Sequence, residues 1–91
     1  RLIFAASPDP LVIARADGGG IIDVNRAFEV ETGITREEAL GKTSAELRLW
    51  NEPARRDEFL GLLRRDGAVS NFEACLCKKG GGIRTCLVSA N

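Results

Sequence analysis

The local patterns that indicate the fold lie in ten consecutive residues, Gly19-Gly20-Ile21-Ile22-Asp23-Val24-Asn25-Arg26-Ala27-Phe28. The glycines end the turn Asp17–Gly20, and Ile21–Val24 is a β-prone run. The run Leu11–Ala16 before the turn is also β-prone, so the two runs predict a hairpin. Asn25 follows at the position of a helix N-cap, where its side chain can accept a hydrogen bond from a free backbone N–H.

Short helices are predicted to follow this hairpin. The helix that begins after Asn25 is expected to end at Gly33, because glycine readily adopts the left-handed conformation that closes a helix. Thr35 and Glu38 have the spacing of a capping box and predict a second helix, which Gly41 ends. Asn25 and Thr35 are therefore interpreted as structural caps, although Asn25 could instead serve as a hydrogen-bonding group of a pocket.

A longer helix is predicted over residues 53–66, followed by a second hairpin. One face of this helix is apolar: Phe59, Leu60, Leu62 and Leu63. The arginine pairs Arg55-Arg56 and Arg64-Arg65 are interspersed with acidic residues and are interpreted as a charged outer face. After Gly67 two β-prone runs, Val69–Cys77 and Ile83–Ala90, flank the turn Lys78–Gly82.

Composition limits the functions that the chain can have. Its 91 residues suffice for one small domain. Thirteen basic residues balance thirteen acidic ones, which argues against a nucleic-acid partner, and the apolar runs are too short to cross a membrane. There is no histidine, so the commonest general base is absent and we expect no enzyme. The odd number of cysteines predicts a reducing, cytoplasmic compartment.

In the order of these elements the chain resembles a PAS domain, the sensor module of bacterial histidine kinases, diguanylate cyclases and other regulators. The resemblance covers nearly all of the chain, as one domain over residues 1–91. It rests on Ser7-Pro8-Asp9, Gly19 to Phe28, Thr32 to Lys42, Leu49-Trp50, Phe59-Leu60, Asp66-Gly67, Phe72-Glu73 and the Lys78–Gly82 turn. The element order predicts an α+β fold, with an antiparallel sheet and short helices on one face.

The chain departs from the family pattern at its end. A PAS sheet has five strands, and the fifth usually lies between the first and the fourth, whereas four strands are recognisable before Asn91. We therefore expect a fragment of a larger multidomain protein, truncated before the fifth strand. A strand from another copy would fill the empty position, or the two half-sheets would close up against each other.

The resemblance also limits the cofactors. A haem held by histidine is excluded because the chain has none, and methionine is absent too. The flavin photosensors of the family form an adduct with a helical cysteine, and residues 44–66 contain no cysteine, which argues strongly against that chemistry. A non-covalent flavin or a small metabolite stays open. The cofactor is thus unknown.

No metal site is expected from the cysteines. Cys75 and Cys77 share a strand face, and Cys86 lies on the next strand, but the set lacks the second Cys-x-x-Cys pair of a structural zinc site. They are interpreted as small apolar fillers or as thiols at an interface.

A ligand pocket, if present, should lie between the sheet and the helices. Its predicted lining is Ile13, Ile21, Phe28, Trp50, Leu60, Leu63, Phe72, Ala74, Leu76, Leu87 and Ser89. Trp50 could stack on a flavin ring, but packing at the helix–sheet junction is favoured for it. A filled hydrophobic core would have the same composition.

Two functions follow from the resemblance. The first is a sensor that binds a small ligand or cofactor and regulates a linked histidine kinase or diguanylate cyclase domain of a two-component or related system. The second is a ligand-free interaction module with a filled core, which dimerises through PAS–PAS contacts. For that outer surface, Cys75, Cys86 and Val88 are the candidates.

Overall fold

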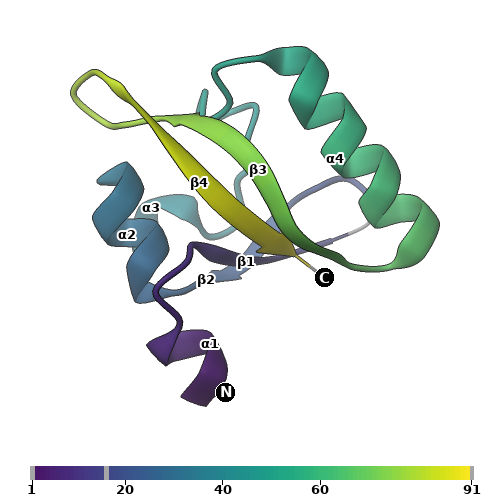
Figure 1. The fold of residues 1–91 in the computed structure, drawn as a ribbon, viewed down its shortest axis with the longest axis horizontal. Helices are drawn as coiled ribbons and strands as arrows, with labels where there is room; N and C mark the ends of the chain where they lie inside the picture. The colour runs from purple at the N-terminus through teal and green to yellow at the C-terminus, as the bar shows by residue number, and fades with distance from the viewer. Residues whose placement is uncertain (1, 16, 91) are drawn as a thin grey trace.

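A computed structural model describes residues 2–15 and 17–90 of the chain. Its elements are, in order, α1 (Leu2–Ala6), β1 (Leu11–Ala14), β2 (Ile21–Val24), α2 (Arg26–Thr32), α3 (Arg36–Ala39), α4 (Pro53–Asp66), β3 (Val69–Cys77) and β4 (Ile83–Ala90). The strands form one sheet in the order β2-β1-β4-β3 (Figure 1). The α+β fold is thereby confirmed.

The predicted helix ends are confirmed where local chemistry sets them. Asn25 Oδ1 accepts the backbone N–H of Phe28 at 3.0 Å, and Gly33 closes α2 with a φ of 75°. Thr35 and Glu38 form the full capping box of α3. The helix α4 has the predicted bounds.

Two other elements differ from the prediction. The strand β1 ends at Ala14, and Ala16, the last residue of its predicted run, lies outside the described residues. The helix α1 was not predicted, because its five residues carry no acidic residue in the first turn and no basic residue in the last.

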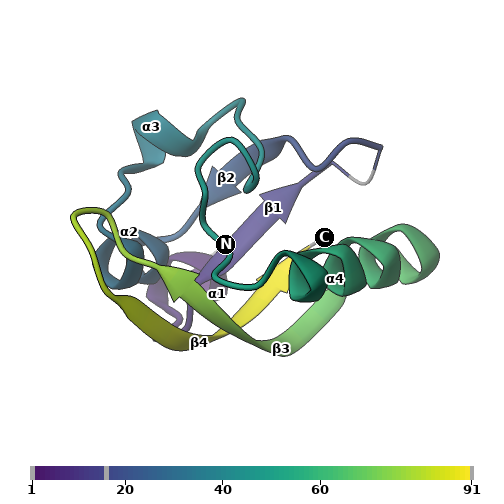
Figure 2. The same ribbon diagram turned by 90° about the horizontal axis from the view of Figure 1, so that it is seen from above.

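The sheet is mixed, which corrects the prediction of a wholly antiparallel sheet. Both hairpins are antiparallel, but β1 and β4 run parallel, with Leu11 opposite Ser89 and Val12 opposite Ala90. In the five-stranded family order, the fifth strand lies between β1 and β4 and runs antiparallel to each of them. Because β1 and β4 both oppose that strand, they point in the same direction. Among the described residues they meet directly, and the half-sheets close up. The second hairpin crosses β1 steeply (Figures 1 and 2).

Backbone groups outside the sheet bond to both of its outer strands. Along β3, the amide of Asn51 donates to the carbonyl of Cys75 at 3.0 Å, and the amide of Cys77 donates to the carbonyl of Leu49 at 2.6 Å. At the outer edge of β2, Ile21 exchanges two backbone hydrogen bonds with residues 41–42. The irregular segment 40–52 thus joins both edges of the sheet.

The helices pack alongside the sheet and enclose the core. The helix α4 packs against β3, α3 packs against β2, and α2 contacts both β1 and β4 (Figure 2). The largest fully buried apolar side chains are Phe28, Leu63 and Leu76, one each from α2, α4 and β3. The hydrophobic interior therefore lies between the sheet and the helices α2 and α4.

Candidate functional site

A small cavity lies in this interior. It is lined by Val12, Ala14, Gly19, Ile21, Phe28, Ser44, Leu49, Trp50, Phe59, Leu60, Leu76 and Val88. Its volume is about 40 Å³, room for a few water molecules at most, since a cavity needs about 10–15 Å³ to hold one. Pockets for drug-sized ligands hold about 300–1,000 Å³. The space between sheet and helices is therefore nearly filled in this conformation.

The structure brings part of the predicted pocket set together at this cavity. Five of the predicted residues line it: Ile21, Phe28, Trp50, Leu60 and Leu76. Leu63 and Ala74 are buried in the surrounding core without lining the cavity, and Phe72 is half-buried against that core. The other lining residues were not in the predicted set.

The predicted inner face of β4 is wrong by one residue. Leu87 is 40% exposed, and Ser89 shares its outer face. Cys86 and Val88, which were expected on the outer face, are 7% and 5% exposed and belong to the core. Val88 stands opposite Phe72 and lines the cavity.

The hairpin connection explains this shift. Cys77 stands opposite Ile83, which leaves the five residues 78–82 as the connection. The same five-residue turn was predicted, and an odd-numbered connection pairs even-numbered residues with even-numbered ones, so the predicted faces of β3 and β4 were inconsistent with that turn. Since side chains alternate along a strand, the difference of one residue exchanges the two faces of β4.

Ile13 is also misplaced in the prediction. It stands opposite Asp23 on the side of β1 away from the cavity, while its neighbours Val12 and Ala14 line the cavity. The β1–β2 ladder contains a bulge, so that Ile21 and Val24 are both buried although they are three residues apart. A strict two-residue period cannot anticipate that irregularity.

The cysteines are divided between the two faces of the second hairpin. Cys86 is buried, and burial raises the pKa of its thiol. Cys75 lies on the opposite face, where its sulfur is 3.6 Å from the hydroxyl of Thr85. Within residues 2–15 and 17–90 no group of three or more histidine, cysteine or acidic side chains could hold a metal ion.

A hydrogen-bonded triad of Ser44, Trp50 and Arg56 lies at the outer side of the cavity. The hydroxyl of Ser44 accepts hydrogen bonds from Trp50 Nε1 at 3.1 Å and from Arg56 Nε at 2.8 Å. Ser44 comes from the irregular segment, and Arg56 from the first turns of α4. Ser44 and Trp50 line the cavity on one side and a surface hollow of about 290 Å³ on the other. These two side chains thus separate the interior from the surface at this point.

Trp50 is held by aromatic packing as well. Its ring centroid lies 5.4 Å from that of Phe59 and 6.1 Å from that of Phe72, spacings at which aromatic rings attract each other. Trp50 also pairs as an isolated bridge with Leu76 of β3. The indole therefore packs at the helix–sheet junction.

The arginine pair at the start of α4 corrects the interpretation of a purely solvated face. The guanidinium of Arg55 lies 4.1 Å above the ring of Phe72, a cation–π contact, and Arg56 belongs to the triad with Ser44. Only the later pair fits the prediction: Arg64 is exposed, and Arg65 forms a surface ion pair with Asp66. The sequence around Ser44 gave no indication of these contacts, because segment 40–52 has no regular period.

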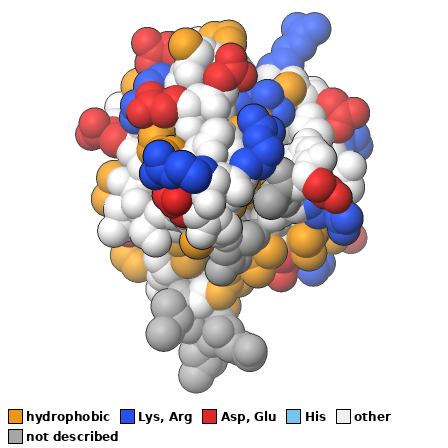
Figure 3. All heavy atoms as spheres, turned by 90° about the vertical axis from the view of Figure 1, so that its right-hand side faces the viewer, with side chains coloured by type: hydrophobic (Ala, Val, Ile, Leu, Met, Phe, Trp, Pro, Cys, Tyr) orange, Lys and Arg blue, Asp and Glu red, His pale blue; other side chains and the backbone are white. Residues whose placement is uncertain are grey.

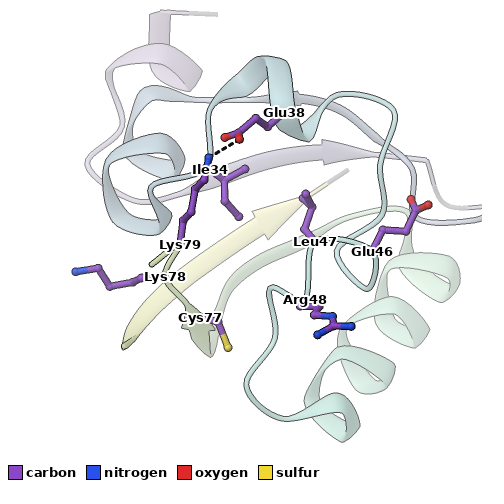
Figure 4. A pocket seen from close by; sticks show the side chains of 8 residues that line it. All are labelled: Ile34, Glu38, Glu46, Leu47, Arg48, Cys77, Lys78 and Lys79. Carbon is purple, nitrogen blue, oxygen red and sulfur yellow. Dashed lines mark hydrogen bonds and ion pairs between the residues drawn. The ribbon is translucent and has the colours of Figure 1, made fainter. Parts of the chain in front are cut away.

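A larger groove lies on the surface between α3, segment 46–48 and the turn of the second hairpin (Figure 4). It has a volume of about 390 Å³. Lys79 points to the carboxylate of Glu38 and pairs with it, while Lys78 points away (Figure 4). The hydrogen bond from Lys79 lowers the pKa of Glu38 to about 2. Within this groove, Lys79 and Glu38 thus neutralise each other.

The surface has no dominant charge on the face viewed from the α4 side. Figure 3 shows acidic and basic side chains interspersed there with apolar ones. Among the described residues, no helix is both long enough and apolar enough to span a membrane.

The described residues thus form an α+β domain with an interior cavity between its sheet and helices. Comparison with known proteins identifies the class: the family model for the PAS fold matches residues 1–91. The chain belongs to the PAS family, whose members are sensory and regulatory modules of signalling proteins.

Two solved structures show the same fold. A PAS domain from Colwellia psychrerythraea has a TM-score of 0.66 and 23% identity, over 91% of this chain and 70% of that one. A PAS domain of a LuxR-family transcriptional regulator from Burkholderia thailandensis, in complex with ethanol, has a TM-score of 0.68 and 18% identity, over 96% and 76%. No curated protein matches the chain.

Proposed function

We propose that the chain is the sensory PAS domain of a cytoplasmic bacterial signal-transduction protein, in which occupancy of the interior cavity biases a linked output domain. The observation that carries this proposal is the cavity itself, which shares the lining residues Ser44 and Trp50 with a surface hollow. A ligand shifts an equilibrium only if it binds one conformation better than the other. A cavity that must expand to admit a ligand meets that condition.

The size of the cavity favours a small metabolite over a flavin. Its volume of about 40 Å³ is far below the size of a drug-like pocket. The PAS domain from Burkholderia thailandensis was solved with ethanol, a ligand of only three heavy atoms. The output domain would be a histidine kinase or diguanylate cyclase, as the sequence resemblance implies, or the remainder of a transcriptional regulator, as in this relative.

Native mass spectrometry tests the sensor function. The purified chain, incubated with a mixture of small metabolites, is expected to carry an added mass that disappears on denaturation, and this mass would identify the ligand. A denatured spectrum of the same sample is the control for covalent additions. If the chain keeps its bare mass with every metabolite, the sensor function is contradicted.

A second candidate function is dimerisation, in which the outer sheet face meets a second copy of the chain. The observation in its favour is that Leu87 and Ile83, both on the outer face of β4, are 40% and 55% exposed, while the core is nearly filled. Apolar side chains exposed on one face of a sheet are a feature that interaction surfaces share.

Replacing Leu87 with glutamate tests this second function. Under it, the wild-type chain is expected to sediment as a dimer and Leu87→Glu as a monomer, because a charge would be buried at the interface. The folding free energy should change by only about 0.5 kcal/mol, as is usual at exposed positions. Val30→Glu on α2, at a position that is 62% exposed, is the matched control. A wild-type monomer, or a variant that remains dimeric, would contradict this function.

A further inference from the structure

The surface hollow next to Trp50 has the chemistry of an anion site. Its lining residues are Ser44, Ala45, Arg48, Trp50, Pro53, Arg56 and Asp57, and its volume of about 290 Å³ is close to the lower limit for small-molecule sites. Two guanidinium groups face one carboxylate, so the lining carries a net positive charge. The hollow also lies at the start of α4, where the helix dipole adds positive potential.

The two arginines, Arg48 and Arg56, are available to bind an anionic ligand. Within the described part of the chain, neither Arg48 nor Arg56 forms an ion pair. Arg56 donates to Ser44 through Nε, and no hydrogen bond of its terminal nitrogens to another described residue is found. A guanidinium presents its donors as a planar fork that matches the two oxygens of a carboxylate.

The backbone at Arg48 gives an independent reason to consider this side chain. Arg48 has a φ of 52°, in the left-handed region that glycine or asparagine usually occupies. A large residue in that conformation often accompanies a functional role, because the strain must be offset elsewhere. Figure 4 shows the Arg48 side chain extending from its loop toward α4, on which Arg56 lies.

The remaining lining is apolar. The indole of Trp50, the ring of Pro53 and the methyl group of Ala45 offer a surface for the body of a ligand rather than for a second charge. The combination selects an anion with a flat or compact apolar body. A small aromatic carboxylate has both features.

We propose that this hollow binds a small carboxylate on Arg56, and that binding releases Ser44 from Arg56, so that Ser44 and Trp50 can move and open the path to the interior cavity. A carboxylate that takes the Nε edge of the Arg56 fork competes directly with the Ser44 hydroxyl for the same N–H. Ser44 then loses one of its two donors and moves with Trp50. This proposal rests on the sensor function, since it names the class of ligand and the first step of its entry.

The single tryptophan makes the test direct. Benzoate is titrated into the ¹⁵N-labelled chain while the one indole N–H resonance is recorded, at constant ionic strength. The expected result is a saturable shift of that resonance, because its hydrogen bond to Ser44 changes. Benzamide, which has the same shape without the charge, should bind at least about tenfold more weakly, since charge-assisted hydrogen bonds are roughly twice as strong as neutral ones.

Variants identify the residue responsible. Arg56→Gln should weaken benzoate binding by at least about tenfold, and Arg56→Lys should restore only part of it, because lysine keeps the charge but loses the fork. Arg64→Gln, an exposed arginine on the same helix, is the matched control and should bind as the wild type does. Amide spectra of each variant establish that it is folded.

Two results would overturn the proposal: equal binding of benzoate and benzamide, or unchanged benzoate binding by the folded Arg56→Gln variant. Complete absence of benzoate binding up to saturation of its solubility would overturn it as well. If native mass spectrometry nevertheless detects a neutral molecule bound to the chain, the sensor function survives and only the carboxylate site fails. If both experiments fail, the sensor function fails with it.

Discussion

Replacing Phe28 with alanine is expected to lower the free energy of unfolding by about 3–5 kcal/mol, the usual cost of truncating a buried phenylalanine. Phe28 is completely buried in α2 and lines the interior cavity. Its removal takes away apolar surface and enlarges a void that rigid neighbours cannot fill. Since small domains have a total stability of about 5–15 kcal/mol, the loss is a large fraction of the whole.

Urea unfolding followed by far-ultraviolet circular dichroism measures this effect. Val30→Ala is the matched control, because Val30 belongs to the same helix and is 62% exposed. That control should change the stability by no more than about 0.5 kcal/mol. A Phe28→Ala variant that loses less than about 1 kcal/mol would show that this side chain does not occupy the tight core position described here.

Replacing Asn25 with alanine is expected to have the second-largest effect, a loss of about 3 kcal/mol. Asn25 is only 3% exposed, and its side chain makes four hydrogen bonds. Its oxygen accepts the amides of Leu11 and Phe28, and its nitrogen donates to the carbonyls of Phe4 and Asp9. Losing a cap costs about 1 kcal/mol, and each buried backbone group left without a partner costs about 1–3 kcal/mol.

Two further variants separate the capping role of Asn25 from its hydrogen bonds to the distant residues Phe4 and Asp9. Thr35→Ala removes an exposed cap and should cost only about 1 kcal/mol. Asn25→Asp keeps the accepting oxygen but loses both donors, so it should remain well below the wild type in stability. If Asn25→Asp were as stable as the wild type in the same urea experiment, the contacts to Phe4 and Asp9 would contribute nothing.

The sequence predicted those parts of the fold that local chemistry determines. Asn25 and Thr35 mark helix starts because their side chains bond to backbone groups only a few residues away. Gly33 closes α2 because it adopts a positive φ without steric cost. For such features the interacting groups lie within one or two turns of each other, so a short stretch of sequence contains all the information.

Features that depend on distant partners could not be predicted in this way. Both faces of β4 carry apolar side chains, so its composition alone did not show which face is inward, although the predicted five-residue turn implies that Val88 points inward and Leu87 outward. The parallel β1–β4 pair joins residues from opposite ends of the chain. The contacts of Ser44 with Trp50 and Arg56 depend on an irregular segment, whose path follows from no residue period.

The backbone bonds that segment 40–52 makes to β2 and β3 have a consequence for self-assembly. An uncovered outer strand is a template on which identical molecules can stack edge to edge and grow into a filament. Here the outer amide and carbonyl groups of β3 around Cys75 and Cys77 already have partners within the same molecule. Open-ended growth along this edge of the sheet is therefore blocked where these bonds are made.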